Sequence, residues 1–240
     1  MSRVVSSLIA GEPVEGAPGD TITVPNPARL DQVAAEAALG DAETFVLACR
    51  TARSTQREWS AVPAPVRGRA IQQLGRLVES NLETLARLIT REIGKPIAES
   101  RGEVQEVVDT CNFFVSEGRR LYGMTVPSEL PDKQLFTFRA PIGVAAIVTA
   151  GNFPVAVPSW YLVPALLCGN AVVWKPAEYT PSIADAFARL FLHAGFPAGA
   201  FNMVLADGPT TFEGLERALG EGLVDKVGFT GSTDVGRRIG

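Results

Sequence analysis

The sequence predicts an α/β fold with a parallel sheet, flanking helices, an N-terminal helical layer and an exposed hairpin. Short apolar runs, mostly rich in β-branched residues, recur toward the C-terminus at 144–148, 171–174, 201–205 and 224–229. Stretches of about a dozen residues or more separate them, which is long enough for crossover helices. The first two runs lack polar alternation, as is typical of strands buried on both faces. Repeated β-α-β units of this kind make the fold Rossmann-like.

The first part of the chain, residues 1–125, is predicted to be mainly helical. Apolar residues recur at helical spacing, with Arg and Glu between them, over 41–59, 65–93 and 98–121. Gly94 is expected to end one helix in the left-handed conformation, and Pro96 bars its continuation.

Residues 126–142 are predicted to form the exposed hairpin, because the sequence from Pro127 to Arg139 turns extended and polar. Residues 143–240 are predicted to form the sheet core. Within the core, Thr180 is expected to cap a helix that begins at Pro181 and closes by Gly195. Ser232 or Thr233 is expected to cap another helix directly after a strand.

Composition excludes several classes of protein. The 240 residues carry a formal net charge of −4, which argues against nucleic acid or an anionic membrane as the main partner. Three cysteines argue against a disulfide framework and favour a reducing, cytoplasmic location. The N-terminal sequence matches the pattern of a secretory signal too weakly to be one. No uninterrupted apolar segment reaches the length of about 18 residues that indicates a transmembrane helix. No cluster of ligand residues indicates a metal.

Polar segments close three of the predicted strands: Gly151-Asn152-Phe153-Pro154, Lys175-Pro176-Ala177-Glu178 and Phe229-Thr230-Gly231-Ser232-Thr233. In open parallel sheets, ligands bind in the crevice beyond the carboxyl ends of the strands. A helix start after the third segment would present free N–H groups to a phosphate, and Gly231 would let a bulky anion approach the backbone.

These segments, with Gly169-Asn170, Glu92-Ile93-Gly94-Lys95-Pro96 and Pro25-Asn26-Pro27, resemble the NAD(P)-dependent aldehyde dehydrogenase superfamily. The match lies in its N-terminal, cofactor-binding portion and covers essentially the whole chain, with the motifs in the right order and spacing.

The resemblance assigns one catalytic residue and a set of cofactor contacts. Asn152 matches the side-chain amide that donates to the oxyanion of the tetrahedral intermediate. The positions that match cofactor-binding residues are Val148, Thr149, Ala150, Lys175, Glu178, Gly208, Gly231, Ser232, Thr233 and Gly236. Lys175 and Glu178 match the pair that bonds the adenosine ribose hydroxyls. A carboxylate there repels a 2′-phosphate, so NAD is favoured, with NADP still possible.

The chain departs from the family pattern at two places. Gly151 stands where the family most often has tryptophan, which suggests a wider or more mobile entrance. Ala206 stands where the family often has another glycine, and the loop from Gly208 through Gly214 is expected to be lengthened.

The resemblance also implies chemistry that these 240 residues are expected to lack. Family members use a cysteine nucleophile and a glutamate base that lie beyond the turn at residue 231, in a catalytic domain expected to be absent here. Cys168, in the apolar helix that begins at Leu162 and just before Gly169, is expected to be a small buried hydrophobe. Cys49 and Cys111 lie in the helical layer, with no His nearby in sequence to activate them. His193 is expected to be the polar end of a helix. The chain alone is therefore expected to be inactive.

Three functions remain open. The first is an oxidoreductase that oxidises an aldehyde, a semialdehyde among the options, to a carboxylate with NAD(P). The second is a catalytically inactive dinucleotide-binding module, and the third is a scaffold without ligand. Asn152 would be useless to a pure binder, so it favours the first.

Two further expectations concern surfaces. The hairpin resembles the family's oligomerisation hairpin, which implies a homodimer or homotetramer for a complete protein. Trp160 and Tyr161 could line a substrate tunnel, but packing against the sheet is favoured.

Overall fold

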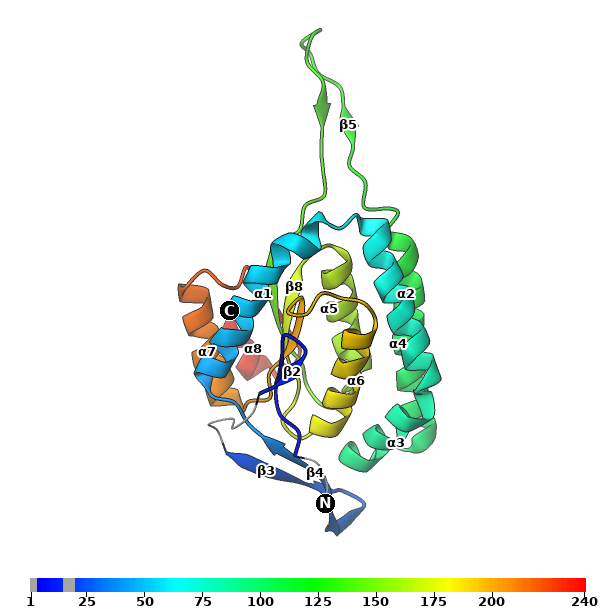
Figure 1. Cartoon of the computed structure of the whole chain (residues 1–240), viewed down its shortest axis with the longest axis vertical. Helices are drawn as coiled ribbons and strands as arrows, with labels where there is room; N and C mark the ends of the chain where they lie inside the picture. Colours follow the sequence, from blue (N-terminus) through cyan, green and yellow to red (C-terminus); the bar gives the residue numbers. More distant parts are fainter. Residues whose placement is uncertain (1–3, 15–19) are drawn as a thin grey trace.

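The computed structural model describes residues 4–14 and 20–240 (Figure 1). In chain order the elements are β1 (Leu8–Ile9), β2 (Glu12–Pro13), β3 (Thr21–Asn26), β4 (Arg29–Ala38), α1 (Ala42–Ala61), α2 (Ala64–Ser80), α3 (Leu82–Ile93), α4 (Ile97–Glu117), β5 (Thr125–Val126), β6 (Leu135–Phe136), β7 (Val144–Val148), α5 (Ala156–Leu167), β8 (Ala171–Lys175), α6 (Pro181–His193), β9 (Phe201–Met203), α7 (Gly208–Gly220), β10 (Lys226–Phe229) and α8 (Thr233–Ile239). The α/β class and the flanking helices are as predicted.

The central sheet has the strand order β10-β7-β8-β9-β1-β2. β7, β8, β9 and β10 pair in parallel, and Val148 lies opposite both Lys175 and Phe229, so these three strands end level with one another. From β7 the chain adds β8 and β9 on one side and then returns to add β10 on the other. The junction of β7 and β10 is therefore a topological switch point, where α/β sheets bind ligands.

The sheet is not purely parallel, because the N-terminal part contributes strands that the sequence did not reveal. β1 pairs antiparallel with β9 through Leu8 and Met203, and β2 pairs antiparallel with β1. β3 and β4 form a separate antiparallel ribbon. Very short strands and a ribbon that is largely exposed leave only a weak apolar pattern.

Helices cover both faces of the sheet, which explains the continuous hydrophobicity of β7 and β8 (Figure 1). Val172 and Trp174 belong to the core on the side of α2 to α6. Val173 belongs to the opposite core, with Phe45 of α1 and Leu215 of α7. Successive strand residues thus enter two different cores, as buried parallel strands require.

The helical layer matches the prediction except for one break. The stretch predicted over 65–93 is two helices, α2 and α3, separated at Asn81 with φ −108° and ψ 11°. Gly94 ends α3 in the left-handed conformation, with φ 72°, as predicted. β9 and β10 are shorter than the apolar runs that predicted them.

The expectation of a lengthened loop from Gly208 through Gly214 was wrong, because these residues begin α7. Asp207 caps this helix by accepting a hydrogen bond from the Thr210 amide at 2.8 Å. The glycine at 214 fits a packing role, since a Cβ there would lie 2.6 Å from Cβ of Phe45 on α1.

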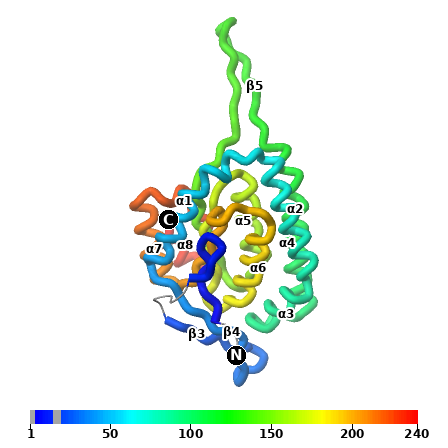
Figure 2. Tube along the Cα trace, viewed as in Figure 1, coloured from blue at the N-terminus to red at the C-terminus, as the bar shows by residue number. Residues whose placement is uncertain are grey.

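The predicted hairpin is present between β5 and β6, where Thr125 pairs with Phe136 and Val126 with Leu135. It projects from the body of the protein (Figure 2). Phe136 and Phe138 are 60% and 81% exposed, and their rings contact each other. None of the helices in the described part of the chain has the length and apolar character needed to cross a membrane.

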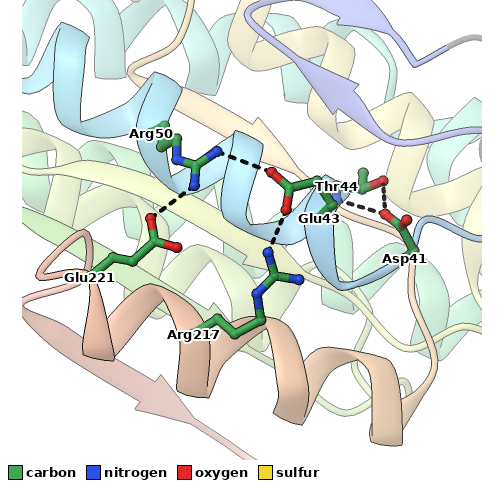
Figure 3. A network of polar contacts seen from close by, with 6 residues as sticks. All are labelled: Asp41, Glu43, Thr44, Arg50, Arg217 and Glu221. Carbon is green, nitrogen blue, oxygen red and sulfur yellow. Dashed lines mark hydrogen bonds and ion pairs between the residues drawn. The ribbon is translucent and has the colours of Figure 1, made fainter.

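A surface network of charged side chains joins α1 to α7 (Figure 3). Glu43 on α1 accepts hydrogen bonds from Arg50, at 3.0 Å, and from Arg217 on α7. Arg50 also donates to Glu221 at 2.9 Å. Asp41 caps α1 by accepting from the Thr44 amide at 2.8 Å. The network is exposed and lies outside the site described next.

Candidate functional site

A cavity of about 390 Å³ lies at the carboxyl ends of β7, β8 and β10. The first two turns of α7 and residues Val235, Arg238 and Ile239 of α8 form its far wall. Its lining residues are Val148, Thr149, Ala150, Lys175, Ala177, Glu178, Tyr179, Gly208, Pro209, Thr211, Phe212, Leu215, Phe229, Thr230, Gly231, Ser232, Val235, Arg238 and Ile239. The cavity is thus at the switch point between β7 and β10.

The structure brings most of the residues assigned to cofactor binding into this one cavity: Val148, Thr149, Ala150, Lys175, Glu178, Gly208, Gly231 and Ser232. Thr233 and Gly236 lie on α8, behind Ser232, and are not among the lining residues. Asn152 also lies outside the lining, on the turn that leads from β7 to α5. Sequence reasoning missed the apolar wall contributed by Pro209, Phe212 and Val235.

Lys175 and Glu178 form an ion pair on one side of the cavity. Lys175 Nζ donates to Glu178 Oε2 at 2.8 Å, and the lysine side chain is 7% exposed while that of Glu178 is 40% exposed. Burial alone would raise the pKa of Glu178, but the hydrogen bond and charge of Lys175 outweigh it and leave that pKa below its usual value. Glu178 is therefore a carboxylate at neutral pH, with surface available to a ligand.

Neighbouring side chains fix the strand ends beside this pair. The Trp174 indole N–H donates to Thr149 Oγ1 at 3.0 Å, within the buried sheet. The Ala150 amide donates to Thr230 Oγ1 at 3.4 Å, which links the end of β7 to the segment after β10. The backbone at 148–150 is thereby held at the cavity wall.

The segment after β10 differs in one respect from expectation. A Cβ at Gly231 would lie 2.6 Å from Cζ of Phe229, so the space at this glycine is taken by an aromatic ring. The predicted cap is present, because Ser232 Oγ accepts from the Val235 amide at 3.3 Å. The hydroxyl of Ser232 thus has a structural partner already.

The Asn152 turn is held from the helical layer. Glu103 of α4, with its side chain fully buried, accepts hydrogen bonds from the Val155 and Ala156 amides at 3.0 and 3.3 Å. Lys95 pairs with Glu103 at 2.5 Å and lies 3.7 Å from the centre of the Phe153 ring. Asn152 itself is exposed and has no side-chain hydrogen bond in the described part of the chain. Its amide is free to donate to a ligand.

The corresponding helix start after β8 is held in the same way, and here a predicted cap was wrong. Thr180 stands at the N-cap position and Pro181 begins α6, as predicted, but the Thr180 side chain makes no capping hydrogen bond. Its hydroxyl donates instead to the Ala177 carbonyl at 3.1 Å. The carboxylate of Glu92, on α3, instead accepts from the Ser182 and Ile183 amides at 2.7 and 3.0 Å. A long-range carboxylate replaces the local hydroxyl because it can accept from both amides at once.

The expected wider entrance at Gly151 was wrong, because a neighbouring aromatic ring fills the space. The Tyr179 ring lies against Gly151, and its hydroxyl accepts a hydrogen bond from the Gly151 amide at 3.2 Å. Sequence reasoning missed Tyr179, whose only local signal was its place directly after Glu178.

The cysteines are not placed for chemistry at this site. Burial raises the pKa of Cys49 and of Cys111 to about 12. Burial also raises the pKa of Cys168 despite the charges of Arg67 and Arg139. Cys168 ends α5, at the opposite end from Asn152, and a helix of 12 residues is about 18 Å long. A thiol there is too far from Asn152 to act with it.

The two aromatic residues of α5, Trp160 and Tyr161, have different surroundings. Tyr161 packs against the sheet as expected, with its hydroxyl 3.4 Å from the Phe229 carbonyl. Trp160 does not, because it is 47% exposed and faces the surface beside Phe113 and Phe114 of α4. His193 ends α6, as predicted.

Comparison with known proteins agrees with the motifs. The sequence profile described as the aldehyde dehydrogenase family matches residues 14–240. The chain is 40% identical over 232 residues to a mitochondrial succinate-semialdehyde dehydrogenase of Oryza sativa, covering 97% of this chain and 43% of that protein. It is 37% identical over 239 residues to an alpha-ketoglutarate semialdehyde dehydrogenase of Haloferax volcanii, covering 100% of this chain and 49% of that one.

Solved structures show the same relation. The crystal structure of an NADP-dependent enzyme of E. coli superposes with a TM-score of 0.93 at 36% identity, over 98% of this chain and 48% of that one. An NAD-dependent benzaldehyde dehydrogenase of Corynebacterium glutamicum superposes with a TM-score of 0.91 at 32% identity, over 98% of this chain and 50% of that one. The chain spans about half the length of the relatives it matches.

Proposed function

Because the chain belongs to the aldehyde dehydrogenase family, we propose that the protein carrying it oxidises an aldehyde to a carboxylate with NAD(P). In this proposal the present chain supplies the dinucleotide site and the oxyanion donor. The observation that carries it is the cavity at the switch point, which gathers eight of the ten assigned cofactor positions, Val148, Thr149, Ala150, Lys175, Glu178, Gly208, Gly231 and Ser232, but neither Thr233 nor Gly236.

The size and the lining groups of the cavity suit a dinucleotide. Its volume of about 390 Å³ lies within the range typical of small-molecule sites. Apolar side chains from α7 and α8 offer a wall for a flat base, and the partly exposed Glu178 carboxylate offers two acceptors to a ribose diol. Arg238, 4.9 Å from the centre of the Phe212 ring, adds a cation at the same wall. When bound, the nicotinamide would accept the hydride removed from the aldehyde carbon.

The chain's own residues divide into two tasks. Glu178, held by Lys175, would accept hydrogen bonds from the ribose hydroxyls and repel a 2′-phosphate, which favours NAD over NADP. Asn152 would donate its side-chain amide to the oxyanion that develops on the substrate oxygen. The backbone at Val148, Thr149 and Ala150 would contact the cofactor between these two points. Ser232, Thr233 and Gly236 would contribute through the start of α8.

A catalytically inactive dinucleotide-binding module remains the second candidate, and the structure offers one observation for it. None of the three cysteines is both near Asn152 and of lowered pKa, so residues 4–14 and 20–240 contain no thiolate nucleophile for the reaction. Residues 1–240 alone should therefore bind NAD without oxidising aldehyde. A scaffold without ligand would leave the Lys175–Glu178 pair in its cavity unexplained.

Several finer proposals rest on the relatives. The semialdehyde dehydrogenases among them favour a small aldehyde that carries a carboxylate. We propose that the protein acts in the cytoplasm and assembles as a homodimer or homotetramer through the β5–β6 hairpin, whose exposed Phe136 and Phe138 would be covered by a second subunit.

The reaction is tested in the complete protein with succinate semialdehyde and NAD, by the absorbance of reduced nicotinamide. Asn152→Ala should lower kcat by about 100- to 1,000-fold, the effect of removing one oxyanion donor. Asn112→Ala, at an exposed position on α4, is the matched control. If the complete protein binds NAD but reduces none of it with any of a panel of aldehydes, the result would favour the second candidate, a catalytically inactive dinucleotide-binding module.

Cofactor choice is tested by calorimetric titration of NAD and NADP. Glu178→Gln should weaken NAD binding by roughly 1 to 2 kcal/mol, because the ribose hydroxyls lose a charged acceptor and keep a neutral one. NADP should lose less, or gain, because the substitution removes like-charge repulsion. Glu216→Gln, exposed on α7, should change neither. Equal losses for the two cofactors would show that Glu178 is not at the ribose.

A further inference from the structure

Gly151 and Tyr179 form a complementary pair beside the cavity, whose lining includes Tyr179 but not Gly151. A Cβ at residue 151 would lie 2.5 Å from Cε2 and 2.8 Å from Cζ of the Tyr179 ring, and 2.9 Å from Cβ of Ala177. Gly151 does not have a positive φ, so its backbone conformation does not require glycine. Space does, because the tyrosine ring occupies the volume of a side chain at 151.

Tyr179 also connects two loops that have different tasks. It follows Glu178 on the loop after β8, lines the cavity and is 48% exposed. Its hydroxyl accepts a hydrogen bond from the Gly151 amide at 3.2 Å, on the loop after β7.

The hydrogen bond to Gly151 bears on Asn152, the next residue. The turn between β7 and α5 is held at its far end by Glu103, which accepts from the Val155 and Ala156 amides. Tyr179 holds its near end. Between these two anchors Asn152 is exposed, so its orientation depends on both.

We propose that Tyr179 is a positioning residue for Asn152 and a contact for the dinucleotide. Its hydroxyl fixes the Gly151 amide, and its exposed ring covers the cofactor between Glu178 and the Asn152 turn. The part of this inference that concerns kcat rests on the proposed function. The glycine at 151 is then explained as the residue that makes room for this ring.

The experiment compares Tyr179→Phe and Tyr179→Ala with the wild type in the complete protein. Tyr179→Phe removes only the hydroxyl, so kcat should fall about 3- to 10-fold with the NAD dissociation constant unchanged, as loss of one neutral hydrogen bond implies. Tyr179→Ala also removes the ring, so NAD should bind about 10-fold more weakly. Tyr122→Phe, at a tyrosine that is 69% exposed near the hairpin, is the matched control.

A readout independent of turnover is hydrogen exchange of the peptide that spans residues 149–153. The Gly151 amide should exchange faster in Tyr179→Phe and be unchanged in Tyr122→Phe. Unchanged exchange in Tyr179→Phe, or unchanged NAD affinity in Tyr179→Ala, would overturn the corresponding part of the proposal. If the wild type oxidises no aldehyde, exchange and NAD binding still decide the role of Tyr179, and only the proposed function fails.

Discussion

Two buried glutamates cap two helices of the sheet core, and they differ in how their charge is balanced. Glu92 caps α6 through the Ser182 and Ile183 amides, and Glu103 caps α5 through the Val155 and Ala156 amides. Glu103 has a buried cation beside it, because Lys95 pairs with it and is only 11% exposed. Glu92 forms no ion pair in the described part of the chain. The same local task is thus done with and without an ion pair.

The comparison also shows how the helical layer serves the site. Glu92 belongs to α3 and Glu103 to α4, whereas the helices they cap follow the loops that carry Glu178 and Asn152. Neither α5 nor α6 has a side-chain cap from its own N-terminal residue. Both amides at each helix start would be unsatisfied without the layer. The layer therefore fixes where the two loops turn into helices.

The largest expected effect comes from removing the counter-charge of Glu103. Lys95→Met should destabilise the protein by roughly 3 to 5 kcal/mol, because it leaves a fully buried carboxylate without its cation. The measurement is urea unfolding. Lys133→Met, at an exposed lysine of the hairpin, is the control. Adding Glu103→Gln to Lys95→Met should recover much of the loss, and equal costs for Lys95→Met and Lys133→Met would contradict the ion-pair argument.

A smaller effect is expected when the unpaired glutamate is changed. Glu92→Ala should cost about 2 kcal/mol, since two buried amides lose their acceptor. Glu92→Gln keeps an acceptor and removes a buried charge, so it should cost less than about 1 kcal/mol. Glu103→Gln should cost more than Glu92→Gln, because it leaves Lys95 unpaired. If the two Gln substitutions are equal in urea unfolding, the counter-charge makes no difference.

The pH dependence of stability should separate the wild type from Glu92→Gln. Burial raises the pKa of Glu92 above its usual value of 4.5, although the Ser182 and Ile183 hydrogen bonds and the charge of Arg91 oppose the shift. A group whose folded pKa is raised contributes stability that is fully present below the unfolded pKa. That contribution is lost as pH rises from about 4.5 through the folded pKa.

Unfolding in urea at a series of pH values above 4.5 measures this. The wild type should lose stability with rising pH relative to Glu92→Gln, whose side chain does not titrate. A Glu178→Gln variant should follow the wild type above pH 4.5 and differ from it only in a second series below pH 4.5, because the pKa of Glu178 is lowered and its contribution to stability is lost as pH falls through the folded pKa. Parallel curves for the wild type and Glu92→Gln would show that the Glu92 carboxyl has an ordinary pKa in the folded protein.

The two glutamates also show what a single sequence can and cannot predict. The strands β7 and β8 and the segments after them were predicted because each signal lies within a few residues of the structure it describes. The Ser232 cap was predicted for the same reason. The Glu103 cap joins residues 52 apart and the Glu92 cap joins residues 90 apart, so no local pattern could reveal either.

The errors have the same cause. Thr180 has the residue type of a helix cap, yet the Ser182 and Ile183 amides donate to Glu92, which lies on another helix. Gly151 indicated an open entrance, yet Tyr179 filled it from the next loop. The pairing of β1 with β9 brings Leu8 beside Met203, far beyond any local signal. The residue type at each position indicates which interactions its side chain can make. Which partner it actually meets depends on the tertiary fold.

The smallest expected effect sharpens the contrast between buried and exposed pairs. Arg50 bonds Glu43 and Glu221 on the surface between α1 and α7, with about half of its side chain exposed, at 48% (Figure 3). Exposed pairs gain little because water screens the charges and ordering two long side chains costs entropy. Arg50→Ala should therefore leave the urea midpoint within experimental scatter, at low and at high salt. A loss comparable to that of Lys95→Met would mean that the exposed network between α1 and α7 contributes as much to stability as the Lys95–Glu103 pair.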